Sequence, residues 1–159
     1  DCQYTVSGEL GELRSYLISK LYWDPYMTEE EYQYHIDDFL KGYYGEGWEA
    51  VRYYIDTAMQ RVEEEGLHVG CFVQHGYVGL TADDVAEIKT RFAAAAELAT
   101  DAQKDRLERV YISVIMAERA TYMYYGYDRQ NIEKALACFE EAKVLAQKWG
   151  IKRSHYSTW

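Results

Sequence analysis

The sequence predicts an all-α protein, an up-and-down bundle of about six helices arranged as helical hairpins. Apolar residues recur at intervals of three and four along six segments, and Thr, Asp, Pro and Gly stand at the ends of these segments. The short connections between the segments favour antiparallel neighbours. With 159 residues, the chain is long enough to form one domain, residues 1–159, with one sizeable core.

A sharp break separates the first two predicted helices. The first runs from about Ser7 to Trp23, and Pro25 ends it because proline disfavours the α region at Asp24 and cannot donate a backbone N–H. Its apolar stripe consists of Leu10, Leu13, Leu17 and Leu21. Three further side chains widen this stripe: Tyr16, Ile18 and Tyr22. We therefore expect the first helix to be covered on more than one side.

The second and third helices have start and stop signals of their own. Thr28 and Glu31 form the pattern of a capping box, so the second helix runs from about Thr28 to Tyr44. Gly42 and Gly45 mark its end, because glycine adopts a left-handed cap without steric cost. The third helix spans residues 46–65.

Glycines interrupt residues 67–80, which we predict to form a glycine-rich loop long enough to suggest a role. Thr81 is the expected N-cap of a fourth helix. The fifth spans residues 101–125 and is apolar over a wide face, so we place it at the centre of the bundle. The sixth spans residues 128–149. The tail, residues 151–159, shows no periodicity and is predicted to be loosely ordered.

The net charge of −10 argues against two classes of partner. Nucleic acids require a basic surface that replaces phosphate counterions, and anionic lipid surfaces also attract basic residues. In addition, no apolar run approaches the roughly 20 residues that a membrane-spanning helix needs. We therefore predict neither a nucleic-acid partner nor a membrane partner.

Three motifs resemble a known family: SGELGELRSYL at residues 7–17, KLYWDP at residues 20–25 and FLKGYYG at residues 39–45. They resemble the helical C-terminal region, catalogued as a domain of unknown function, that follows a (β/α)8 barrel in glycoside-hydrolase-like proteins of the α-glucuronidase and hexosaminidase type. The resemblance extends over roughly the first 60 residues.

This resemblance implies an accessory helical domain that supports a preceding barrel of the same polypeptide. Residues 7–23 would be the last helix of that barrel or a buttress against it. The resemblance also favours a fragment excised from a larger, secreted or periplasmic protein that binds carbohydrate through its barrel. Because family members place their catalytic carboxylates in the barrel, it transfers no catalytic role to any residue of this chain.

Three residues are candidates for carbohydrate contact. Glu9 and Glu12 lie one helical turn apart and could share a face. Glycoside hydrolysis needs two carboxyl groups about 5–5.5 Å or about 6.5–9.5 Å apart around a cleft. However, acidic residues in a first turn are also favoured by the helix dipole. Tyr44 is the third candidate, an outward ring for stacking on a sugar, whereas we expect Tyr43 and Trp48 in the core.

The sequence does not favour a metal or any other cofactor. His68, Cys71 and His75 are potential zinc ligands, but no second ligand cluster follows them, and a glycine-rich surface loop explains them better. The odd, widely spaced set of Cys2, Cys71 and Cys138 is not a disulfide framework and leaves the redox compartment open. We expect Cys138, inside a helical pattern, to be a buried free thiol.

A second interpretation remains open, a tetratricopeptide-like scaffold for protein–protein interaction. ALACFEEAK at residues 135–143 resembles the second helix of such a repeat, and the 17 tyrosines of the chain suit an interface. A true array should repeat at 34 residues, but residues 101–109 do not match. An accessory domain should expose an apolar patch near its first helix, and a scaffold should form a concave groove.

Overall fold

The computed structural model describes residues 10–67, 79–125, 128–151, 153–154 and 157–158. This part of the chain is all-α, which confirms the predicted class. Its elements are α1 (Gly11–Trp23), α2 (Glu29–Tyr44), the 3-10 helix η1 (Gly45–Gly47), α3 (Trp48–Glu64), α4 (Ala82–Leu98), α5 (Asp101–Tyr125), α6 (Arg129–Lys148), β1 (Arg153–Ser154) and β2 (Ser157–Thr158). The two-residue strands pair antiparallel within the tail, a feature that the sequence did not predict.

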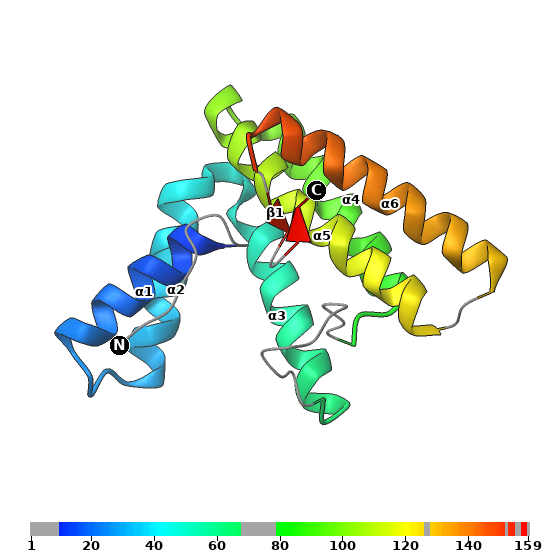
Figure 1. Cartoon of the computed structure of the whole chain (residues 1–159). Coiled ribbons are helices and arrows are strands. Elements are labelled where there is room, and N and C mark those ends of the chain that lie inside the picture. The colour runs from blue at the N-terminus through cyan, green and yellow to red at the C-terminus, as the bar shows by residue number, and fades with distance from the viewer. Residues whose placement is uncertain (1–9, 68–78, 126–127, 152, 155–156, 159) are drawn as a thin grey trace.

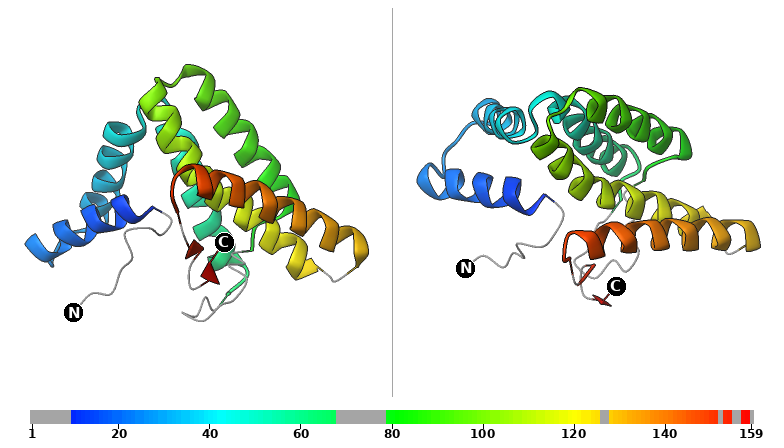
Figure 2. Two further views of the ribbon diagram at one scale, coloured as in Figure 1. Left: turned by 45° about the horizontal axis from the view of Figure 1, so that its top comes forward. Right: turned by 90° about the horizontal axis from the view of Figure 1, so that it is seen from above.

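Consecutive helices pack against one another, with α5 in the middle. Helix α5 lies against α2, α3, α4 and α6, which confirms its predicted central place. Figure 1 shows α5 and α6 side by side, while α1 and α2 form a separate hairpin at the other end of the molecule. Figure 2 shows that α1 is set apart from α4, and α1 has no close backbone contact with α4 or α6. Among the described elements, only α2 supports the backbone of α1 closely.

Local interactions end the helices close to the predicted positions. The N–H of Asp24 donates to the carbonyl of Lys20, and Asp24 itself is extended, so α1 ends at Trp23 as Pro25 predicts. Leu10 has a left-handed φ of 50°, so α1 begins at Gly11 rather than near Ser7. The predicted loop lies mostly outside the described residues, because residues 68–78 are not among them.

Two capping boxes begin α2 and α4. At α2, the hydroxyl of Thr28 accepts the N–H of Glu31 at 3.3 Å, and the Glu31 carboxylate accepts the N–H of Thr28 at 2.8 Å. Thr81 and Asp84 form the same reciprocal pair at the start of α4. These bonds satisfy amide groups that the first helical turn leaves without partners.

We expect the Thr28→Ala variant to lose about 0.5–2 kcal/mol of unfolding free energy, because alanine cannot accept the amide hydrogen bond at the start of α2. Urea denaturation followed by circular dichroism measures this loss. Thr90→Ala is the matched control, since Thr90 is an exposed residue inside α4, where alanine is the better helix former. Equal midpoints for the wild type and Thr28→Ala would show that this cap does not stabilise the fold.

The core consists of two clusters. The larger one is formed by the five helices α1, α2, α3, α4 and α5 and includes the buried side chains of Leu13, Leu17 and Leu40. The smaller one lies between α5 and α6, where α6 contributes the small residues Cys138, Ala142 and Ala146 and so permits close approach. No helix in the described part is long and apolar enough to span a membrane.

Candidate functional site

Large aromatic side chains are exposed at the end of α1 and in the turn that connects it to α2. Tyr22, Trp23 and Tyr26 are 70%, 90% and 91% exposed, and we call residues 22–26 the aromatic turn. The described residues of this chain therefore do not supply all of the cover that the sequence predicts for α1. Helix α2 covers the side that carries Leu13 and Leu17, and the side that carries Tyr22 is left open.

Hydrogen bonds within the aromatic turn hold its backbone. The side-chain carboxylate of Asp24 accepts the N–H of Tyr26 at 3.0 Å, and the backbone carbonyl of Asp24 accepts the N–H of Met27 at 3.4 Å. Pro25 adds its restricted φ between them. The exposed rings therefore project from a turn with few accessible backbone conformations.

A small pocket of about 190 Å³ lies beside the aromatic turn, and we call it the turn pocket. It is lined by Lys20, Trp23, Asp24, Met27, Glu31 and His35. Two of its polar side chains lie close to Tyr16. The Nδ1 atom of His35 lies 3.3 Å from the hydroxyl of Tyr16, and the ammonium of Lys20 lies 5.1 Å from the centre of the same ring. The pocket thus combines an indole ring with hydrogen-bond donors and acceptors.

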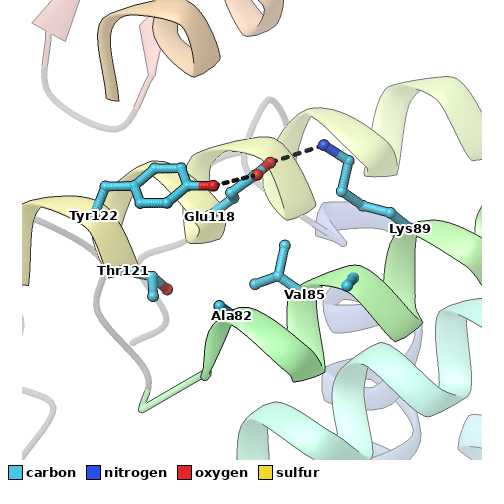
Figure 3. A pocket seen from close by; sticks show the side chains of 7 residues that line it. Ala82, Val85, Lys89, Glu118, Thr121 and Tyr122 are labelled. Atoms are coloured by element: carbon cyan, nitrogen blue, oxygen red, sulfur yellow. Dashed lines mark hydrogen bonds and ion pairs between the residues drawn. The ribbon is translucent and has the colours of Figure 1, made fainter. Parts of the chain in front are cut away.

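A second pocket, of about 360 Å³, opens between α4 and α5 (Figure 3). It is lined by Ala82, Val85, Ala86, Lys89, Glu118, Thr121 and Tyr122. The ammonium of Lys89 lies 2.9 Å from Glu118 Oε2, and the hydroxyl of Tyr122 donates to Glu118 Oε1 at 3.0 Å. Burial alone would lower the pKa of Lys89, but the hydrogen bond and charge of Glu118 outweigh it and raise that pKa.

The other titratable groups around Glu118 stay protonated at neutral pH. Burial, and then the charge of Glu118, raises the pKa of Tyr122. Burial also raises the pKa of the Cys138 thiol, to about 12, so this group is not a thiolate nucleophile. Cys138 is free and buried, as predicted. Because Lys89 and Glu118 satisfy one another, this cluster is suited to holding α4 against α5.

The structure corrects the prediction for Tyr44. Its ring is only 3% exposed and so does not offer an outward face to a sugar. Tyr44 follows Ile36 and Leu40 at intervals of four residues, on the buried stripe of α2. Tyr43 is the half-buried neighbour instead, and its ring contacts both Phe39, 5.2 Å away, and the guanidinium of Arg106, 4.4 Å away.

The remaining candidates divide between a structural contact and positions outside the described residues. Glu12 lies 3.3 Å from the guanidinium of Arg109, so it links α1 to α5. Glu9 is outside the described residues, as are Cys2 and the three potential zinc ligands His68, Cys71 and His75. Within the described ranges, no group of three or more His, Cys, Asp or Glu side chains could hold a metal ion.

Sequence reasoning missed both the aromatic turn and the Lys89–Glu118 pair. The aromatic turn has a signal, namely three aromatic residues around an Asp-Pro dipeptide, but Tyr22 was assigned to the apolar stripe of α1. The Lys89–Glu118 pair has no signal in the sequence, because the two residues are 29 positions apart on different helices.

Comparison with known proteins identifies one matching family. The family model described as "Domain of unknown function (DUF4838)" matches residues 2–56. The match spans α1, α2, η1 and the first part of α3, and therefore includes the aromatic turn. It agrees with the predicted resemblance to a domain of unknown function. No curated protein and no solved structure matches the chain.

Proposed function

We propose that the chain is an accessory helical domain of a carbohydrate-active, glycoside-hydrolase-like protein, and that the open side of α1 rests on a preceding (β/α)8 barrel of the same polypeptide. One observation carries this proposal: α1 has apolar side chains on two sides, but the described chain covers only one of them. An apolar surface left open on a helix is typical of an interface with another domain.

The open side consists of side chains one turn apart. Ile18, which is half-buried, and Tyr22 are four residues apart and therefore lie on the same side of α1. The exposed Leu21 borders them. Leu13 and Leu17, on the other side, are buried in the core cluster. This surface lies inside the segment that the family model matches. Its residues Leu21 and Tyr22 belong to the motif KLYWDP, which carries the resemblance to barrel-associated domains and so supports the proposal.

The proposed role is structural. The bundle would cover the outer surface of the barrel, and α1 would be held between α2 and that surface. Chemistry would stay in the barrel, and the 159-residue chain would contribute stability and one edge of the substrate cleft.

Hydroxyl-radical footprinting read by mass spectrometry tests the proposed interface. The 159-residue chain and the whole polypeptide that contains it are labelled under the same conditions. We expect the labelling of Tyr22 to fall at least about threefold in the whole polypeptide, because docking removes its ring from water. Leu98 is the control, since it is 72% exposed at the end of α4, away from α1, and its labelling should not change.

Equal labelling of Tyr22 in the two samples would overturn the proposed interface. The proposed interface would also be overturned if the sequence of the whole polypeptide contained no barrel-length segment of alternating strands and helices. Both results are independent of whether this chain binds sugar.

The alternative is a tetratricopeptide-like scaffold for protein–protein interaction. An exposed apolar stripe on α6 favours it, because Ile132 and Leu136 lie one turn apart on the surface of the α5–α6 hairpin. In the footprinting experiment, protection at Leu136 without protection at Tyr22 would support the scaffold instead.

A further inference from the structure

We propose that the turn pocket binds a single sugar ring of a neutral oligosaccharide, with Trp23 as the stacking surface. This assignment names the ligand class of the carbohydrate-active domain proposed above, and so rests on that proposal. It concerns a different surface from the one proposed to meet the barrel.

Trp23 and the barrel-facing residues point in different directions. Trp23 follows Ile18 by five residues, which places it about 140° around the helix from Ile18. The pocket is formed with α2, whose Glu31 and His35 complete its wall. Docking of the Ile18–Tyr22 side therefore leaves the face of Trp23 available to a ligand.

The rings offer the apolar half of a sugar site. Trp23 and Tyr26 are the most exposed of the large apolar side chains in the described residues, and such ring area in contact with water is unfavourable. A flat ring can stack on the C–H-rich face of a pyranose while the hydroxyl groups of that sugar point outward. Because Asp24 and Pro25 hold the backbone of the turn, little backbone entropy is lost when a ligand stacks on the rings.

The polar lining supplies the other half. Carboxylates at Asp24 and Glu31 can accept hydrogen bonds from hydroxyl groups, and the ammonium of Lys20 can donate one. Charged residues of both signs line the same small pocket, which favours a neutral polyol over an anion or a cation. Glu31 is held by Thr28, and His35 by Tyr16, so these groups are arranged before a ligand arrives.

The size of the pocket limits the ligand to one ring. Its volume of about 190 Å³ lies below the roughly 300–1,000 Å³ of sites that enclose drug-sized molecules. Further units of an oligosaccharide would extend past the pocket, where Tyr26 offers a second exposed ring. The larger pocket at Lys89 is a weaker candidate, because its charged groups already satisfy one another.

Isothermal titration calorimetry of the 159-residue chain tests the site. The probes are cellohexaose, xylohexaose, maltohexaose and chitohexaose, each titrated to about 10 mM, which reaches the weak affinities expected of a single-ring contact. We expect at least one probe to bind. The Trp23→Ala variant should bind it at least about tenfold more weakly, the size of loss typical of a central aromatic contact. The Trp23→Phe variant, which keeps a flat ring, should stay within about threefold of the wild type.

Two control variants separate this proposal from the barrel interface. Leu98→Ala removes an exposed apolar side chain on α4, and Tyr22→Asp disrupts the proposed barrel-facing side, so both should bind sugar like the wild type. Circular dichroism confirms that each variant is folded. If Trp23→Ala loses helix content, Lys20→Ala, which removes a donor from the pocket wall, serves as the second test of the same site.

Failure to bind any of the four probes would overturn the sugar site. So would binding that Trp23→Ala leaves unchanged. Neither outcome affects the Tyr22 footprint. Conversely, sugar binding together with an unprotected Tyr22 would keep the site and overturn the barrel interface.

Discussion

The Leu40→Ala variant is expected to lose about 2–5 kcal/mol of unfolding free energy, the largest effect predicted here for a single substitution. Leu40 is completely buried on α2, within the cluster that joins α1 to α5. The change to alanine removes three side-chain carbon atoms and leaves a cavity that the surrounding helices cannot fill entirely. Guanidinium denaturation monitored by circular dichroism measures the loss.

Leu98→Ala is the matched control, because the same side chain is removed from the exposed end of α4. Its unfolding free energy should stay within about 0.5 kcal/mol of the wild type. A loss below about 1 kcal/mol for Leu40→Ala would contradict the described packing of α2 in the core.

The Glu118→Ala variant is expected to lose about 1–3 kcal/mol of unfolding free energy, because the half-buried ammonium of Lys89 then has no carboxylate partner. It also removes the acceptor of the Tyr122 hydroxyl. The range is lower than for a fully buried pair, since a third of the Lys89 side chain reaches solvent and is screened. Thermal and urea unfolding of the two proteins measure the difference.

The pH dependence of this difference has a defined sign. The pKa of Lys89 is higher in the folded chain than in the unfolded one. The Lys89–Glu118 pair therefore contributes its full stabilisation below the ordinary lysine pKa of about 10.4. The contribution is then lost as the pH rises toward the folded-state pKa. The difference in unfolding free energy between the wild type and Glu118→Ala should therefore be constant from pH 7 to about pH 9 and become smaller above about pH 10.4.

Arg129→Ala is the control for Glu118→Ala. It breaks an ion pair with Glu133, four residues later on α6, in which both side chains are largely exposed. Such pairs contribute little, so the loss should be below about 0.5 kcal/mol. Equal losses in the two variants would mean that the Lys89–Glu118 pair behaves as an ordinary surface pair.

Helix ends were predictable because their causes are local. Thr28 and Glu31 are three residues apart, and so are Thr81 and Asp84; each pair forms the bonds that define a helix start. Pro25 acts on its immediate neighbour. Such interactions lie within one turn of the chain, so the residues alone determine them.

The orientation of the aromatic residues was less predictable. Tyr43 and Tyr44 are adjacent, and a rotation of one helical position, about 100°, exchanges the buried ring for the half-exposed one. Apolar residues of α1 lie on more than one of its sides, so the pattern does not say which side meets α2 and which stays open. Nothing local distinguishes a tyrosine for the core from one for an interface.

By itself the sequence determined the all-α class, the six α-helices among the described residues and most of their boundaries, because periodicity and caps act over three or four residues. Only the tertiary structure decided that Tyr44 is buried, that Tyr22 and Trp23 are open to solvent, and that the turn pocket forms beside them. The physical reason is that burial depends on the neighbour each helix face meets. That neighbour is set by packing between distant segments, which a residue pattern along one helix does not encode.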